Sequence, residues 1–216
     1  MSETSVTIPC GRFNLEGSLG LPERLTRAVP GVVVCHPHPL YGGDMNNNVV
    51  IAVCGALLDR GIATLRFNFR GVGGSGGSFD GGIGEREDAK AALSFLEQRE
   101  EVDPARLGLA GYSFGATVAA TVASGDPRVK VLAAISLPTS NVDALSLGRC
   151  HAPKLFVAGD GDPYVDAPVL QRLAESALPA EVRVVEGADH LWQGNEWEMA
   201  RDVALFFDKA FPLPTG

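Results

Sequence analysis

Short apolar runs alternate with helical patterns along most of the chain. Residues 31–35 are apolar at every position and are bounded by turn residues, which is typical of a strand buried on both faces. Further apolar runs of strand length lie at 62–68, 107–110, 131–136, 155–158 and 182–185. Helical patterns cover 49–60, 85–98, 117–124, 169–177 and 196–210. Strands that alternate with helices predict an α/β protein with a mostly parallel, twisted sheet and helices on both faces.

The N-terminal segment departs from this alternation. Residues 6–8 and 13–19 form two short strand patterns with no helix between them, so we expect an antiparallel pair. With 216 residues and neither an internal repeat nor a long linker, the chain is expected to form a single domain, 1–216.

The composition narrows the class of protein. Apolar residues make up 45% and charged residues 20%, as in soluble globular domains. The formal net charge of −8 argues against nucleic acid or an anionic membrane as the main partner. The first ten residues lack the basic and apolar regions of a secretory signal, and no apolar run has the length of a membrane-spanning helix. We therefore expect a cytoplasmic monomer or homodimer.

The cysteines do not indicate a metal site. Cys10, Cys35, Cys54 and Cys150 show no spacing typical of metal ligands, and most lie in apolar surroundings. We expect buried free thiols, no bound metal and no cofactor.

A Gly-x-Ser-x-Gly pattern at 111–115 follows one predicted strand and precedes a run of small residues. Strand, Gly-x-Ser-x-Gly and helix in this order predict a nucleophile elbow, with Ser113 at a sharp and strained turn. The positions two residues away must then be almost free of side-chain atoms, which Gly111 and Gly115 satisfy.

Two further polar residues follow strand ends. Asp162 comes just after 155–158, and His190 comes just after 182–185. Because chemistry in parallel sheets gathers beyond the carboxyl ends of the strands, we expect both side chains to meet Ser113 there. Asp160 and Asp166 lie in the same loop as Asp162 and compete with it.

Two longer motifs carry a family resemblance. The segment 36–43 reads His-Pro-His-Pro-Leu-Tyr-Gly-Gly, and the segment 70–77 reads Arg-Gly-Val-Gly-Gly-Ser-Gly-Gly. With the elbow, they resemble the α/β-hydrolase superfamily over essentially the whole chain. They are most similar to small lidless bacterial hydrolases of the dienelactone-hydrolase and serine-esterase type. The resemblance implies the α/β-hydrolase fold, a triad in the chain order Ser, Asp, His, and Asp162 as the acid.

Acyl transfer assigns a role to each triad residue. Ser113 needs a base, because a free hydroxyl is a weak nucleophile near pH 7. His190 would take its proton and return it to the leaving group, while Asp162 would orient and stabilise the imidazolium.

A tetrahedral intermediate also needs two backbone N–H donors. One is expected from Phe114, directly after the nucleophile, and the other from the loop after residues 31–35. Prolines 37 and 39 have no N–H and are excluded. The remaining candidates are His38, Leu40 and Tyr41, and we favour Leu40.

The histidine side chains of this loop have a simpler interpretation. His36 and His38 are expected to pin the loop by hydrogen bonds. A metal site built on them is disfavoured, because Pro37 separates them and no third ligand lies nearby.

The glycine-rich loop also contains Gly-x-Gly-x-x-Gly at 71–76, which taken alone suggests dinucleotide binding. The next helix begins too far downstream, near Glu85, and the next strand leads into the serine elbow. We therefore expect a tight loop at the mouth of the active site. Arg66 and Arg70 are expected to form ion pairs with acids such as Asp88.

The connection between the strands at 131–136 and 155–158 has fewer than twenty residues, too few for a cap domain. This predicts an open, shallow site that suits short or medium acyl chains. Aromatic residues that could wall the acyl pocket are Tyr41, Phe79, Tyr112 and Trp192.

The sequence thus predicts a serine hydrolase that cleaves carboxylic esters through an acyl-enzyme on Ser113. The same triad would serve a thioesterase, a lactonase or a hydrolase of peptide-like amides, so the bond cleaved stays open. A catalytically silent binding module is the alternative of another class. The presence of all three triad residues argues against it.

Overall fold

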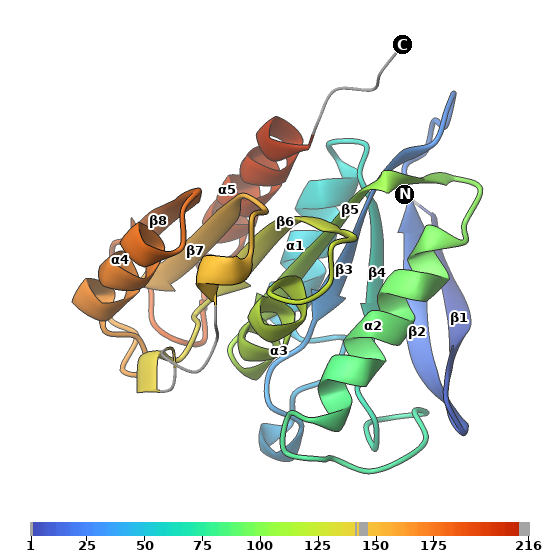
Figure 1. Ribbon diagram of the computed structural model, residues 1–216, viewed down its shortest axis with the longest axis horizontal. Helices are drawn as coiled ribbons and strands as arrows, with labels where there is room; N and C mark the ends of the chain where they lie inside the picture. Colours follow the sequence, from blue (N-terminus) through green and yellow to red (C-terminus); the bar gives the residue numbers. More distant parts are fainter. Residues whose placement is uncertain (1, 141, 143–146, 212–216) are drawn as a thin grey trace.

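A computed structural model describes residues 2–140, 142 and 147–211. Its strands form one eight-stranded sheet in the order β1-β2-β4-β3-β5-β6-β7-β8 (Figure 1). The predicted domain, 1–216, also includes positions 1, 141, 143–146 and 212–216, which lie outside the described residues.

The elements follow the predicted alternation of strands and helices. The strands are β1 Ser2–Cys10, β2 Phe13–Leu21, β3 Val29–Cys35, β4 Ala63–Phe67, β5 Val102–Tyr112, β6 Val129–Ile135, β7 Lys154–Gly159 and β8 Ala180–Val185. The helices are α1 Asn48–Leu58, α2 Gly84–Glu97, α3 Phe114–Ala123, α4 Ala167–Ser176 and α5 Glu196–Ala210, with short 3-10 turns η1 Pro39–Tyr41 and η3 Leu147–Arg149.

The pairing of the strands confirms a mostly parallel sheet. β1 pairs with β2, and β2 with β4, in antiparallel orientation. Every pair from β4 through β3, β5, β6 and β7 to β8 is parallel. β1 and β2 are longer than their apolar patterns, because their pairing continues through positions outside those patterns, such as Glu3 and Gly20.

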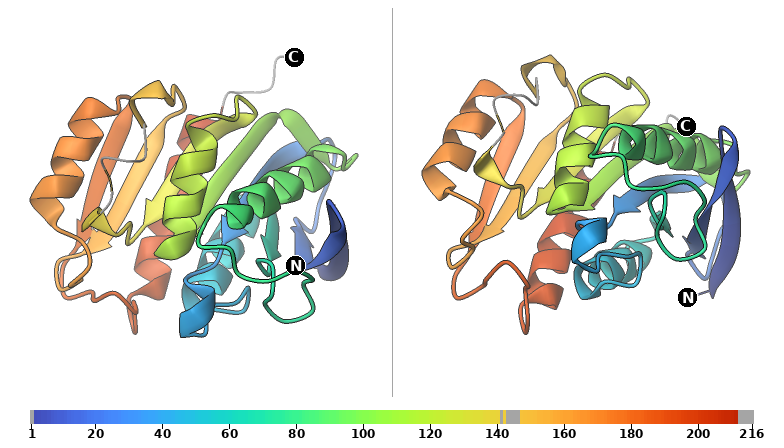
Figure 2. Two further views of the ribbon diagram at one scale, coloured as in Figure 1. Left: turned by 60° about the horizontal axis from the view of Figure 1, so that its bottom comes forward. Right: turned by 90° about the horizontal axis from the view of Figure 1, so that it is seen from below.

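Helices cover both faces of the sheet. The right-hand view of Figure 2 shows α1 and α5 on one side and α2, α3 and α4 on the other. β3 is buried from both sides: Val33 and Cys35 belong to the core beneath α2 and α3, whereas Val32 and Val34 belong to the core beneath α1 and α5. This double burial is the reason that its sequence is apolar without alternation.

The structure also bears on the expected cap domain, cysteines and membrane-spanning helices. In the described part of the connection between β6 and β7, the regular structure is limited to 3-10 turns, at 139–140, at 142 and in η3, and these residues form no cap domain. All four cysteine thiols are buried and free, as predicted. Within the described chain, we find no helix with both the length and the apolar character that bilayer crossing requires.

Candidate active site

The turn between β5 and α3 consists of a single residue. β5 ends at Tyr112 and α3 begins at Phe114, so the helix starts three residues before the predicted segment 117–124. Ser113 has φ 55° and ψ −116°, a conformation that is rare for a residue with a side chain. Such strain persists only where the surrounding structure enforces it, and it holds the serine at the carboxyl edge of the sheet.

The two glycines of the elbow provide space. A Cβ on Gly111 would lie 2.2 Å from the Gly115 carbonyl oxygen. A Cβ on Gly115 would lie 2.3 Å from the Cys35 carbonyl oxygen. The start of α3 therefore packs directly against the end of β3. This contact sets the loop after β3 beside Ser113.

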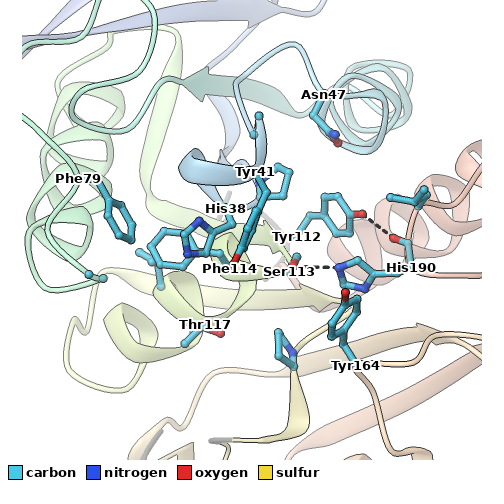
Figure 3. Close-up of a pocket in the computed structure, with 18 of the residues that line it drawn as sticks. His38, Tyr41, Asn47, Phe79, Tyr112, Ser113, Phe114, Thr117, Tyr164 and His190 are labelled. Carbon is cyan, nitrogen blue, oxygen red and sulfur yellow. Dashed lines mark hydrogen bonds between the residues drawn. The ribbon is translucent and has the colours of Figure 1, made fainter.

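The structure brings the three predicted triad residues together. The Ser113 Oγ lies 3.1 Å from the His190 Nε2 (Figure 3). The His190 Nδ1 lies 2.8 Å from the nearer Asp162 oxygen. The three residues follow β5, β8 and β7, so the carboxyl edge of the sheet is what joins them.

Asp162 is the acid that faces the histidine. Its carboxylate is buried and also accepts a hydrogen bond from the Tyr164 N–H at 2.9 Å. Burial raises the pKa of this carboxyl, but hydrogen bonds from His190, Ser136 and the Tyr164 backbone outweigh burial and hold the pKa below its usual range. Asp162 is therefore ionised near neutral pH.

The two competing acids have other roles. The Asp160 Oδ1 accepts a hydrogen bond from the Gly187 N–H at 2.8 Å, which ties the loop after β7 to the loop after β8. Asp166 caps α4, where its Oδ1 accepts from the Val169 N–H at 2.9 Å. Neither carboxylate is within hydrogen-bond reach of His190.

Ser136 is a supporting residue that the sequence reasoning missed. It is fully buried at the end of β6, with φ 47°, and its hydroxyl accepts a hydrogen bond from the Trp192 Nε1 at 2.9 Å. The same hydroxyl helps to hold the pKa of the Asp162 carboxyl below its usual range. Its signal was present, because the predicted strand 131–136 ends in a serine and lies between the strands of the nucleophile and the acid.

Trp192 was predicted to wall the acyl pocket, and this prediction is wrong. Its side chain is 0% exposed and packs in the core beneath α1 and α5. A large aromatic ring whose N–H has a buried partner is stable in the interior, and Ser136 supplies that partner.

Side chains and backbone groups hold the loop that carries His190. The Tyr112 hydroxyl donates to the His190 carbonyl oxygen. The Asn48 side chain donates to the Leu191 carbonyl oxygen at 3.1 Å. The Tyr164 ring contacts the imidazole edge-on, with 4.7 Å between centroids. These contacts fix both the backbone of this loop and the orientation of the His190 imidazole.

A cavity of about 980 Å³ opens over Ser113. The predicted wall residues Tyr41, Phe79 and Tyr112 border it, and the first of these is 88% exposed. The described residues form no cap above it, in agreement with the predicted open site. Its volume lies at the upper end of the range for small-molecule sites, so it is larger than the shallow cleft we predicted.

The loop after β3 corrects the predicted oxyanion donor. The Leu40 N–H donates to the His38 Nδ1 at 3.2 Å, and the Tyr41 N–H donates to the His38 carbonyl oxygen at 3.0 Å. The favoured candidate, Leu40, is therefore wrong, because the η1 turn uses its N–H. Across the described residues, no hydrogen bond is formed by the N–H of either His38 or Phe114, and both border the cavity.

His36 has the structural position that we expected. It is fully buried, its Nδ1–H donates to the Pro37 carbonyl oxygen at 2.7 Å, and its Nε2 accepts from the Phe69 N–H at 3.0 Å. Burial lowers the pKa of this imidazole to about 4, so it is neutral near pH 7. No cluster of three or more potential metal ligands occurs among the side chains that the structure describes.

The glycine-rich loop divides into two parts. Gly73 and Gly74 lie against Glu16 of β2, away from the cavity, whereas Phe79 and Gly82 border the cavity. The expectation that 71–76 lines the mouth is therefore wrong, and the segment just after it does so.

The predicted ion pairs of this region are confirmed in part. Arg70 pairs with the buried Asp88 at 2.7 Å, as expected. Arg66 pairs with Glu3 instead, at 2.8 Å. Both arginines thus form ion pairs within the fold, and that of Arg70 joins the start of the glycine-rich loop to α2.

Comparison with known proteins adds the family. A family model described as X-Pro dipeptidyl-peptidase (S15 family) matches residues 14–205. The chain belongs to this family. A relative of this S15-family chain, the uncharacterized protein RP471 of Rickettsia prowazekii, is 38% identical over 183 residues, which cover 81% of this chain and 76% of that protein.

Solved structures similar to this S15-family chain support the predicted fold. A homologue of α/β serine hydrolases from Coxiella burnetii has a TM-score of 0.85 and 37% identity, covering 95% of this chain and 97% of that one. XC6422 from Xanthomonas campestris, described as an α/β serine hydrolase without lid, has a TM-score of 0.85 and 30% identity, covering 99% and 97%. The chain is thus a member of the α/β serine hydrolase superfamily, and the residues that its structure describes form no lid.

Proposed function

We propose that this protein hydrolyses carboxylic esters with short or medium acyl chains through an acyl-enzyme on Ser113. The observation that supports this proposal is the continuous hydrogen-bonded row from Ser113 through His190 to the buried Asp162, at the floor of an uncapped cavity. A nucleophile, a base and an orienting carboxylate in this geometry are what acyl transfer needs.

In the proposed mechanism, the His190 Nε2 takes the proton as the Ser113 Oγ attacks the ester carbonyl. The Asp162 carboxylate accepts from Nδ1–H, which fixes the tautomer and stabilises the imidazolium. The imidazolium then returns the proton to the leaving alcohol. Water, activated by the same histidine, releases the acid from Ser113 in the second half of the reaction.

The developing negative charge on the carbonyl oxygen needs two donors. We assign them to the N–H groups of Phe114 and His38, which form no hydrogen bond within the described chain. Each such donor typically contributes about 10² to 10³ in rate. The packing of Gly115 against β3 explains why two loops far apart in sequence can supply one oxyanion hole.

The choice of bond rests on the shape of the cavity. An uncapped site offers little enclosed apolar surface, which favours short or medium acyl groups over long ones. The Asp189 carboxylate also borders the cavity, and its Oδ1 accepts from the Leu191 and Trp192 N–H groups, which holds the loop that carries His190. The proposal of an ester substrate therefore rests on the open shape of the site, and turnover of an ester against an X-Pro nitroanilide distinguishes the two bonds.

A panel of acyl substrates tests this function. Purified protein is incubated with p-nitrophenyl butanoate, a butanoyl thioester, a simple lactone and an X-Pro nitroanilide, and is separately labelled with a fluorophosphonate. We expect the fastest turnover on the ester, and covalent labelling that Ser113→Ala abolishes. Full activity in that variant would remove Ser113 from the mechanism. Absence of labelling and turnover would instead favour a silent binding module.

A further inference from the structure

The mechanism divides the cavity at Ser113 into a leaving-group side and an acyl side. His190 must reach the leaving oxygen to protonate it, so the leaving group lies on the side of His190. Figure 3 shows His38 on the opposite side of Ser113, with Phe79 beyond it. The part of the cavity around His38 therefore holds the acyl group, provided that the proposed function is correct.

We call the part of the cavity around His38 the acyl arm. The imidazole of His38 is held firmly there. Its ring centroid lies 4.8 Å from that of Tyr41, 5.0 Å from that of Phe79 and 4.9 Å from that of Phe114. Its Nδ1 accepts the Leu40 N–H at 3.2 Å. The ring is thus fixed by three aromatic neighbours and by one backbone hydrogen bond.

These contacts also fix the tautomer of His38. Because Nδ1 accepts a hydrogen bond, it carries no proton, and a neutral imidazole must then carry its proton on Nε2. Burial lowers the pKa of His38, and the nearby Glu85 opposes this only partly, so the neutral form prevails near pH 7. An N–H donor on Nε2 is the result.

This donor has no partner within the protein. Among the described residues, no hydrogen bond involves Nε2 of His38, and this nitrogen is not one of the buried atoms left without a partner. Since His38 borders the cavity, its Nε2–H is accessible from there. Holding the loop requires only Nδ1, so a structural role does not explain the second nitrogen.

Two further polar side chains that border the cavity can donate a hydrogen bond. The Thr117 hydroxyl and the Arg86 guanidinium border the same cavity. The Glu85 carboxylate next to them is occupied, because its oxygens accept from the N–H groups of Asp80 and Gly82 at 2.9 Å and 2.7 Å. An acyl group that enters this arm meets aromatic walls and hydrogen-bond donors.

We propose that His38 is a specificity-determining residue, whose Nε2–H selects acyl groups that carry a hydrogen-bond acceptor such as a carbonyl oxygen. The preferred substrates are then esters of oxo acids over esters of plain alkanoic acids of the same length. A neutral donor of this kind suits a neutral acceptor and positions the acyl chain against the aromatic walls.

The test compares matched p-nitrophenyl esters: 4-oxopentanoate with pentanoate, and 5-oxohexanoate with hexanoate. The quantity measured is the ratio of kcat/KM within each pair, for wild type and His38→Asn. Asparagine can still accept the Leu40 N–H, as it does at other N-cap positions, but it cannot place a donor where Nε2–H lies. Fluorophosphonate labelling of Ser113 shows whether the variant still assembles the site.

We expect the oxo preference of the better pair to fall by about 3- to 10-fold in His38→Asn, the usual effect of one neutral hydrogen bond. An unchanged ratio would overturn the proposal. If the variant does not fold, the wild-type ratio is compared with that of alkaline hydrolysis without enzyme. A ratio no larger than the chemical one also overturns it. Absence of turnover on all four esters would instead contradict the proposed esterase function.

Discussion

Two segments of the chain share the pattern Gly-x-Ser-x-Gly and follow a strand, but their serines have different surroundings. Ser113, after β5, has its hydroxyl at the cavity, 3.1 Å from His190. Ser75, after β4, is buried, and its hydroxyl donates to the Asn68 carbonyl oxygen at 2.6 Å and accepts from the Glu16 N–H at 2.9 Å. One hydroxyl is available for chemistry, and the other is fully used by the fold.

The glycines of the two segments also serve different purposes. Gly73 and Gly77 have φ of 52° and 80°, so they provide a backbone conformation that other residues rarely adopt. Gly111 and Gly115 have no positive φ and instead provide space for close backbone packing. In the elbow it is the serine that takes the strained conformation. The same residue pattern thus forms a tight turn after β4 and a nucleophile elbow after β5.

The largest effect should come from removing the negative charge of Asp162, which orients His190 toward Ser113. Asp162→Asn leaves the shape of the site intact but favours the wrong histidine tautomer, so kcat on p-nitrophenyl butanoate should fall about 10⁴-fold. Asp160→Asn is the matched control, because asparagine keeps the oxygen that accepts the Gly187 N–H. Equal activities of the two variants would refute the assignment of the acid.

The next largest effect should come from filling the space beside Gly115, where α3 packs against β3. Gly115→Ala would press a Cβ against two backbone carbonyls, and we expect a loss of about 3 kcal/mol in unfolding free energy together with loss of fluorophosphonate labelling. Gly73→Ala meets only side-chain ends of Asn68 and Glu16 and strains one positive φ, so it should cost about 1–2 kcal/mol. Urea denaturation measures both, and a larger loss in Gly73→Ala would contradict the comparison.

A pH dependence of stability should follow from the histidine that links the two regions. His36 follows β3 beside the elbow, and its Nε2 accepts the Phe69 N–H at the start of the glycine-rich loop. Its folded pKa of about 4 lies below the unfolded value, so the unfolded state binds more protons between these values. Stability is complete above about pH 6.5 and falls by about 3 kcal/mol as the pH drops to 4.

His36→Gln provides the control for this pH dependence, because glutamine does not titrate. The difference in unfolding free energy between wild type and variant should shrink as the pH falls from 7 to 4. A difference that stays constant across this range would show that His36 is not the group responsible.

The smallest effect should come from the second serine. Ser75→Ala removes two hydrogen bonds and leaves the Glu16 N–H without its partner, so unfolding free energy should fall by about 1–2 kcal/mol. Its kcat/KM on p-nitrophenyl butanoate should stay close to that of wild type. A loss of activity comparable to that of Ser113→Ala would mean that the two segments are not distinct in function.

The amino-acid sequence by itself determined the layered α/β fold and the three residues that meet at its edge. Burial on both faces makes β3 apolar throughout, and the elbow requires glycine on either side of Ser113. His190 could be placed because parallel strands end at one edge, so residues that follow those ends become neighbours. The same rule placed the acid in the loop after β7, and the family resemblance selected Asp162 within that loop. These are local or topological rules that leave a mark in the residue order.

Only the tertiary structure decided which polar groups are already used. The Leu40 N–H is consumed by His38, Trp192 turns inward to Ser136, and the Ser75 hydroxyl is taken up by β2 and its own loop. A hydrogen bond depends on the distance and direction between atoms that are far apart in sequence, and it removes a donor from chemistry without changing any residue name. The availability of a group is therefore a property of the folded chain.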